Sequence, residues 1–215
     1  DVWAPSGTFI EPQLSDQYAL GYFRKFNNNQ YSIEVEAYYK DIDNRIDYID
    51  GSDLIGNNTI ETEILNGESR AYGFEFLLRK TKGDFTGWLA YTLSKSEQRT
   101  PGGDAGGPGI NDGNWYYNPY DRTHDMSFTG VYKLNKKWSF SANILYQTGR
   151  PVTYPTGQYQ YEGLSIASYS DRNSDRLPAY HRIDISATLV PGKPNKKWQG
   201  EWVFGIYNIY NRRNA

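Results

Sequence analysis

Apolar and polar residues alternate with a period of two along most of this chain, and this pattern restricts the fold strongly. In residues 31–40 one side of an extended strand would carry Tyr31, Ile33, Val35, Ala37 and Tyr39, and the other Ser32, Glu34, Glu36 and Lys40. Seven more segments repeat the pattern: 18–26, 71–79, 85–94, 126–134, 138–146, 181–189 and 202–206. The sequence therefore predicts eight β-strands with one apolar face each. The phase slips after Lys40, which predicts a β-bulge there.

Composition separates this pattern from an ordinary soluble domain. The chain has 20 Tyr and 6 Trp, yet its mean hydropathy is −0.77. Disordered chains are poor in aromatic residues, so disorder is excluded. Zero cysteines exclude disulfides and thiolate chemistry, and a net charge of −2 gives no case for nucleic acid binding.

Membrane crossing by helices is also excluded, because the sequence has no run of about 18 apolar residues. A membrane-spanning strand needs only about 9–11 residues, and only every second one must be apolar. The predicted strands satisfy this requirement. Charged residues on their other face, such as Glu34, Glu36, Glu75 and Arg79, could not face lipid and predict a wet or plugged interior.

The connections between predicted strands alternate in length. Short ones lie near 27–29, 81–84, 135–137 and 191–199, and long ones near 49–68, 96–121 and 150–179. Windows around the short turns (24–29, 79–84, 133–137 and 191–197) hold eleven Lys or Arg and one acid, whereas the long connections hold twelve acids and four Arg. The two strand ends therefore face different surroundings. Outer-membrane barrels sort their connections in this way, with short periplasmic turns and long extracellular loops.

Several motifs resemble one family. They are 70–75 (RAYGFE), 120–125 (YDRTHD), 146–153 (YQTGRPVT), 176–184 (RLPAYHRID) and 207–214 (YNIYNRRN). In this order they resemble the C-terminal barrel of TonB-dependent receptors, in the branch that carries a carboxypeptidase-like regulatory domain ahead of the plug. The resemblance covers nearly the whole chain.

The resemblance implies an all-β, antiparallel up-and-down transmembrane barrel of 22 strands, of which residues 1–215 form about eight. A plug domain and a closing strand are expected outside this segment, because open sheet edges are not tolerated in lipid. The resemblance further implies outer-membrane location and import of a nutrient ligand with energy from TonB. The implied partners are outer-membrane lipid, the plug, the remaining strands, TonB and a surface lipoprotein; no cofactor is implied.

Aromatic residues in the long connections are the predicted ligand-binding residues: Trp115, Tyr116, Tyr117, Tyr120, Tyr154, Tyr159 and Tyr161. Exposed loop aromatics can stack on sugars, peptides or siderophores, and loops on rigid scaffolds often carry function. The alternative is that they pack loop against loop or belong to an aromatic girdle. Near the short turns, Trp138, Trp198 and Trp202 are predicted to mark the periplasmic girdle.

No catalytic or metal-binding residue is predicted. His124 and His181 are the only histidines, and no nucleophile elbow accompanies them, so we expect them to make structural hydrogen bonds. The segment 41–45 begins like a calcium loop, but Ile46 occupies the position that requires glycine, so the EF-hand interpretation fails. An ion site at a barrel rim formed by Asp41, Asp43 and Asp47 is the remaining alternative.

Three alternatives stay open on the sequence alone. A self-contained eight-stranded outer-membrane barrel could serve as an anchor or adhesin. An outer-membrane hydrolase would need catalytic residues converging at the rim. A soluble β-sandwich ranks last, because it gives no reason for the sorting of loop lengths.

Overall fold

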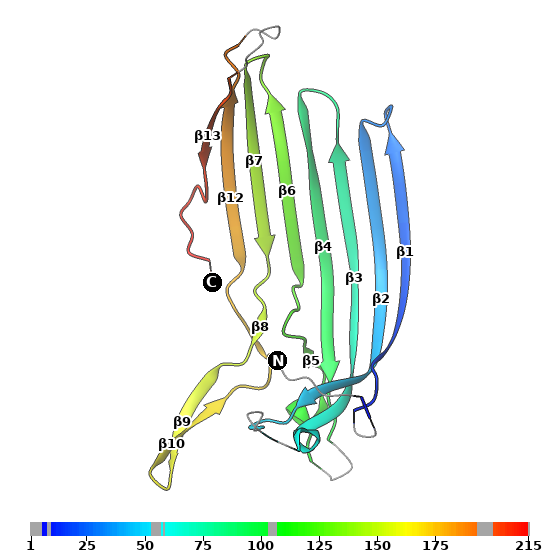
Figure 1. Cartoon of the computed structure of the whole chain (residues 1–215), viewed down its shortest axis with the longest axis vertical. Helices are drawn as coiled ribbons and strands as arrows, with labels where there is room; N and C mark the ends of the chain where they lie inside the picture. Colours follow the sequence, from blue (N-terminus) through cyan, green and yellow to red (C-terminus); the bar gives the residue numbers. More distant parts are fainter. Residues whose placement is uncertain are drawn as a thin grey trace.

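One antiparallel sheet runs through most of the chain (Figure 1). The computed structural model describes residues 6–7, 10–52, 57, 59–102, 107–192 and 200–214. Its long strands are β1 (Leu14–Phe26), β2 (Tyr31–Tyr48), β3 (Ile64–Lys80), β4 (Phe85–Arg99), β6 (His124–Lys133), β7 (Trp138–Gln147), β12 (Tyr180–Leu189) and β13 (Trp202–Ile206). Each pairs with the next in chain order, which confirms the eight predicted strands and their up-and-down topology.

Smaller elements occupy the long connections, at the lower end of the sheet in Figure 1. They are β5 (Tyr116–Tyr117), β8 (Pro151–Val152), β9 (Pro155–Tyr161), β10 (Leu164–Tyr169), β11 (Asp175–Arg176) and the 3₁₀ turns η1 (Ile60–Glu63) and η2 (Ile110–Gly113). β5 pairs with β4, β9 with β10, and β8 with β11. In the described part of the chain, no helix has the length and apolarity needed to span a membrane.

The strand register places the apolar residues of all eight strands on one face. Tyr39 lies opposite Tyr72, and Phe74 lies opposite Leu93. This face is exposed; the Leu20 residue, for example, is 81% exposed. Among the described residues only Ile110 and Tyr116 are buried hydrophobic residues, and both belong to the loops. The apolar face therefore has no protein core to fill, which argues against a soluble sandwich.

The sheet is open. β1 and β13 are the ends of the strand order, and the described residues pair neither edge with the other. These eight strands therefore do not close into a barrel by themselves within the described residues, and the self-contained eight-stranded alternative is not supported.

A β-bulge interrupts β2 where the apolar phase slips. The register between β2 and β3 shifts between Ile42 and Arg45. Asn44 adopts a left-handed conformation with φ of 56°, which asparagine tolerates better than most residues. The bulge predicted after Lys40 is confirmed.

The strands extend further toward the long connections than the alternation predicts. The predicted strand 71–79 is longer in the structure, where β3 begins at Ile64, and β4 continues to Arg99. Polar residues sustain this extension, because Glu68 and Arg99 are register partners and form an ion pair. Backbone pairing thus continues after the apolar stripe has ended, and the loops are shorter than predicted.

Candidate functional site

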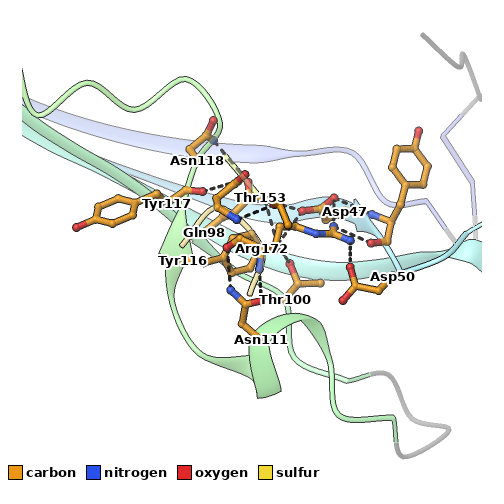
Figure 2. A network of polar contacts seen from close by, with 12 residues as sticks. Asp47, Asp50, Gln98, Thr100, Asn111, Tyr116, Tyr117, Asn118, Thr153 and Arg172 are labelled. Carbon is orange, nitrogen blue, oxygen red and sulfur yellow. Dashed lines mark hydrogen bonds and ion pairs between the residues drawn. The ribbon is translucent and has the colours of Figure 1, made fainter. Parts of the chain in front are cut away.

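A polar network joins the three long connections (Figure 2). The guanidinium of Arg172, from the third connection, donates from Nη1 to Asp47 Oδ1 at 2.9 Å and to the Tyr48 carbonyl at 2.8 Å. The other oxygen of Asp47 accepts hydrogen bonds from the Tyr116 hydroxyl and from Gln98 Nε2, both at 2.7 Å. The Asp47 carboxylate, at the end of β2, therefore links residues of β4, β5 and the third connection.

Further hydrogen bonds attach the third connection to the second. The Arg172 backbone N–H donates to Asn111 Oδ1 at 2.8 Å, and Asn111 Nδ2 donates to the Arg172 carbonyl at 2.9 Å. Asn173 Nδ2 donates to the Tyr117 carbonyl at 2.8 Å. Arg172 also forms an ion pair with Asp50 in the first connection. We call Asp47, Gln98, Asn111, Tyr116 and Arg172 the loop lock.

Electrostatics hold Arg172 and Tyr116 of the loop lock each in one protonation state. Burial alone would lower the pKa of Arg172, but the charges of Asp47 and Asp50 outweigh it, and the pKa is raised. Burial, together with the nearby charge of Asp47, raises the pKa of Tyr116 to about 12. Tyr116 is therefore a neutral hydrogen-bond donor and Arg172 a cation at physiological pH.

Two buried carboxylates reinforce the same region. Glu97, whose side chain is 3% exposed, forms ion pairs with Arg70 and Lys95. Asp121, with a fully buried side chain, pairs with Arg176 and accepts a hydrogen bond from the Ser96 backbone N–H at 2.6 Å. Each buried anion thus has a cation, which a buried charge requires.

Three of the predicted ligand-binding residues pack within these clusters. The guanidinium carbon of Arg70 lies over the Trp115 ring, 4.0 Å from the ring centroid. In the same way, the guanidinium carbon of Arg176 lies over the Tyr117 ring, 4.3 Å from its centroid. Tyr116 is 5% exposed, and its hydroxyl is directed into the loop lock. Their contacts correspond to the loop-packing alternative.

The other four predicted residues are exposed: Tyr120 at 82%, Tyr154 at 42%, Tyr159 at 55% and Tyr161 at 59%. The structure thus divides one sequence-based set into a packed group and an exposed group. Tyr116 and Tyr120 lie only four positions apart and belong to different groups.

The β9–β10 hairpin extends beyond the end of the main sheet (Figure 1). Tyr161 lies opposite Leu164, and Tyr159 lies opposite Ile166, so these four residues share one face. Leu164 is 68% exposed, and Tyr169, which follows on the second strand, is 62% exposed. Neither Leu164 nor Tyr169 is among the residues predicted from the sequence. The turn Glu162-Gly163, which has positive φ at both positions, was the available signal for a hairpin.

The remaining candidates make structural contacts. Nδ1 of His124 is hydrogen-bonded to the Tyr91 hydroxyl at 2.9 Å, and Nδ1 of His181 to the Tyr210 hydroxyl at 2.8 Å. Trp138 and Trp202 both lie opposite Leu189, on the apolar face near the short turns. Trp198 lies outside the described residues.

The sheet is open and antiparallel, and one of its faces is apolar. Short turns lie at one end and hydrogen-bonded loops at the other. These features define a wall segment of a transmembrane β-barrel. The sequence matches the family model described as TonB dependent receptor-like, beta-barrel, over residues 1–209. The chain therefore belongs to the TonB-dependent receptor family. No curated protein matches the sequence.

Two solved receptors share the fold. The ferripyoverdine receptor of Pseudomonas aeruginosa, bound to ferripyoverdine, aligns with a TM-score of 0.61 and 12% identity over 94% of this chain and 24% of the receptor. The ferric-catecholate import receptor Fiu of E. coli aligns with a TM-score of 0.61 and 15% identity over 99% of this chain and 26% of the receptor. The chain thus spans about a quarter of either receptor.

Proposed function

We propose that this chain supplies wall strands and outer loops of an outer-membrane receptor that binds a nutrient ligand and imports it. The family supports the receptor class, and both solved neighbours are receptors for ferric siderophores by their descriptions. The observation that carries the proposal is the pairing of an exposed apolar sheet face with an ordered loop cluster at one end. Such a cluster is a scaffold for ligand contacts.

The proposal assigns partners to each part of the segment. Membrane lipid covers the apolar face, and the remaining strands of the barrel pair with β1 and β13. A plug domain faces the polar side of the sheet, and TonB acts on the receptor through that plug. A surface lipoprotein is a further candidate partner at the loops.

The exposed tyrosines are the proposed ligand contacts. Tyrosine rings offer large contact areas with a polar hydroxyl at the rim, which suits stacking on sugars or catecholates. Tyr159 and Tyr161 point from one face of the β9–β10 hairpin, and Tyr120 and Tyr154 are the other two. The packed residues Trp115, Tyr116 and Tyr117 would act by positioning these loops.

The base of the hairpin lies beside Arg172 of the loop lock in the sequence, and hydrogen bonds join its two strands there. The Ser170 backbone N–H donates to the Tyr154 carbonyl at 2.8 Å, and Ser170 Oγ accepts from the Tyr154 N–H at 3.1 Å. Thr153 Oγ1 accepts from the Asn173 N–H at 3.0 Å, next to Arg172. Holding the hairpin in one orientation lowers the entropy lost when a ligand is bound.

The test uses the complete receptor that contains this segment, displayed in the outer membrane of a Gram-negative host. Cells are offered radiolabelled probes of three classes: a ferric catecholate, a malto-oligosaccharide and a dipeptide mixture. We expect one class to bind, and we expect its uptake, but not its binding, to stop when TonB is deleted. Uptake that continues without TonB would contradict import by the proposed mechanism.

A double variant tests the ligand contacts. Tyr159→Ser with Tyr161→Ser should weaken binding by about tenfold or more, because each lost aromatic contact contributes roughly 1 kcal/mol. Gln158→Ser with Gln160→Ser changes the opposite face of the same strand and is the matched control. Equal binding by the two double variants would exclude the hairpin from the ligand site.

A further inference from the structure

The apolar face of the sheet contains a hollow of about 560 Å³ near the short-turn end. Small residues form its floor, and aromatic rings stand around it. Ala142 lies opposite Gly130 and Ile185, and Ala187 lies opposite Phe140 and Phe204. A hollow of this volume falls within the range of pockets that hold small ligands.

The rings that border the hollow are ordered by contacts with each other. Phe85 and Phe128 stack with their centroids 6.5 Å apart, and a Cβ on Gly130 would lie 2.7 Å from the Phe128 ring and 3.0 Å from the Phe85 ring. Glycine at this position therefore allows both rings to lie close to the sheet. Tyr132 (47% exposed) and Phe140 (42% exposed) border the other side.

Among the described residues that line the hollow, the Tyr132 hydroxyl is the one polar side-chain group on this face of the sheet. Ser141 and Ser186 also contribute to its lining, but they are register partners on the opposite face of the sheet and hydrogen-bond to each other at 2.7 Å. The part of a ligand that enters the hollow must therefore be apolar. Such a ligand gains free energy by covering apolar surface, and gains nothing from hydrogen bonds within the hollow.

A lysine lies beside this hollow on the same face. Lys80 ends β3 in register with the apolar residues, and its ammonium lies 5.7 Å from the centroid of the Phe85 ring, which borders the hollow. Within the described residues Lys80 has no ion-pair partner. Lysines at the end of an apolar membrane face place their stems along apolar groups and their charge at the headgroup level.

We propose that the hollow binds one acyl chain of an anionic phospholipid, with the lipid phosphate beside Lys80. The apolar lining selects the chain, and the cation next to it selects the charge of the headgroup. The windows around the short turns hold eleven basic residues and a single acid, and this excess of positive charge also favours a negatively charged headgroup. The inference rests on the proposed membrane placement, but not on which ligand the receptor imports.

The experiment is native mass spectrometry of the complete receptor, released from a mild detergent after titration with phosphatidylglycerol or phosphatidylcholine. We expect one phosphatidylglycerol to stay bound at concentrations at which phosphatidylcholine does not. A receptor that retains the two lipids equally would overturn the role assigned to Lys80.

Filling the hollow should weaken the retention of phosphatidylglycerol. Ala142→Phe places a ring on the floor and should weaken phosphatidylglycerol binding by about tenfold or more, since displacing two chain methylenes suffices for that factor. Ala187→Leu is a second, milder filling variant in case the first inserts poorly. Ala37→Phe is the control, because Ala37 is an exposed residue of the same apolar face on β2, away from the hollow. Equal retention by wild type and both filling variants would overturn the site.

Lys80→Gln tests headgroup selection separately from acyl-chain binding. It should remove the preference for phosphatidylglycerol over phosphatidylcholine while leaving acyl-chain binding in place. An unchanged preference would assign the headgroup to another cation and overturn this part. Binding of the radiolabelled probes is measured on the same variants and should be unchanged, so that failure of ligand import and failure of the lipid site are distinguishable.

Discussion

Arg172 Nη1 lies 2.9 Å from Asp47 Oδ1, although the two residues are 125 positions apart in the sequence. This ion pair connects the end of β2 to the base of the β9–β10 hairpin. The Tyr116 hydroxyl reaches the other oxygen of the same carboxylate. One aspartate thus links the end of β2 to the second and third long connections, which carry the exposed tyrosines.

Replacing Arg172 with methionine should loosen all three connections. Asp47 would keep Tyr116 and Gln98 as donors but lose its cation, and we expect a loss of about 1–3 kcal/mol of local stability. The measurement is backbone amide hydrogen exchange over residues 110–118 and 170–174 in the complete receptor. Arg150→Met is the control, because Arg150 is exposed in the same connection. Identical exchange in the two variants would refute the role of Arg172.

Alkaline pH should weaken the loop lock through Tyr116. Its pKa is raised from 10.0 to about 12 by burial, so the folded state holds the proton more tightly than the unfolded state. The contribution of Tyr116 to stability is full below about pH 10 and is lost as pH rises toward about 12.

The pH effect is measured by comparing wild type with Tyr116→Phe. The difference in tyrosinate absorbance should titrate near pH 12, and the loss of loop stability between about pH 10 and 12 should be smaller in the variant. Tyr120→Phe, which changes an exposed tyrosine in the same connection, should lose as much loop stability over this pH range as wild type does. A difference titration centred near pH 10 would show that Tyr116 is not held in the lock.

A single methyl group at Gly149 should disturb the third connection. A Cβ there would lie 1.7 Å from the Leu177 carbonyl oxygen, so the backbone must move. Gly149→Ala should therefore cost about 1–3 kcal/mol, the usual range for overpacking. The urea midpoint of the receptor in vesicles reports this loss. Gly157→Ala, where nothing lies within 4 Å of the added Cβ, should leave the midpoint unchanged.

A charged side chain on the apolar face should destabilise the barrel far more than one on the polar face. Phe74→Lys places an ammonium in lipid and should destabilise the barrel by roughly 2–4 kcal/mol if this position lies near the bilayer centre. Thr92→Lys is matched in depth, because Thr92 lies opposite Glu75, the neighbour of Phe74 in β3. Urea unfolding in phospholipid vesicles compares the two. Equal stabilities would mean that the apolar face does not contact lipid.

The eight strands, the shared apolar face and the bulge in β2 follow from the sequence, because period-two alternation is a local property of consecutive residues. A slip of one residue would turn every apolar side chain to the wrong face, so the pattern also specifies the register. The alternation ends with the apolar stripe, and for this reason it could not indicate that β3 begins at Ile64 or that β4 continues to Arg99.

Only the tertiary structure determines which loop aromatics are packed and which are exposed. Tyr116 and Tyr120 have the same chemistry and nearly the same position in the chain, yet one is 5% exposed and the other 82%. Tyr116 is buried because strand pairing brings Asp47, Gln98 and Thr100 to its hydroxyl. Those partners come from segments far apart in the sequence, and their approach depends on the register of the whole sheet, which no local pattern contains.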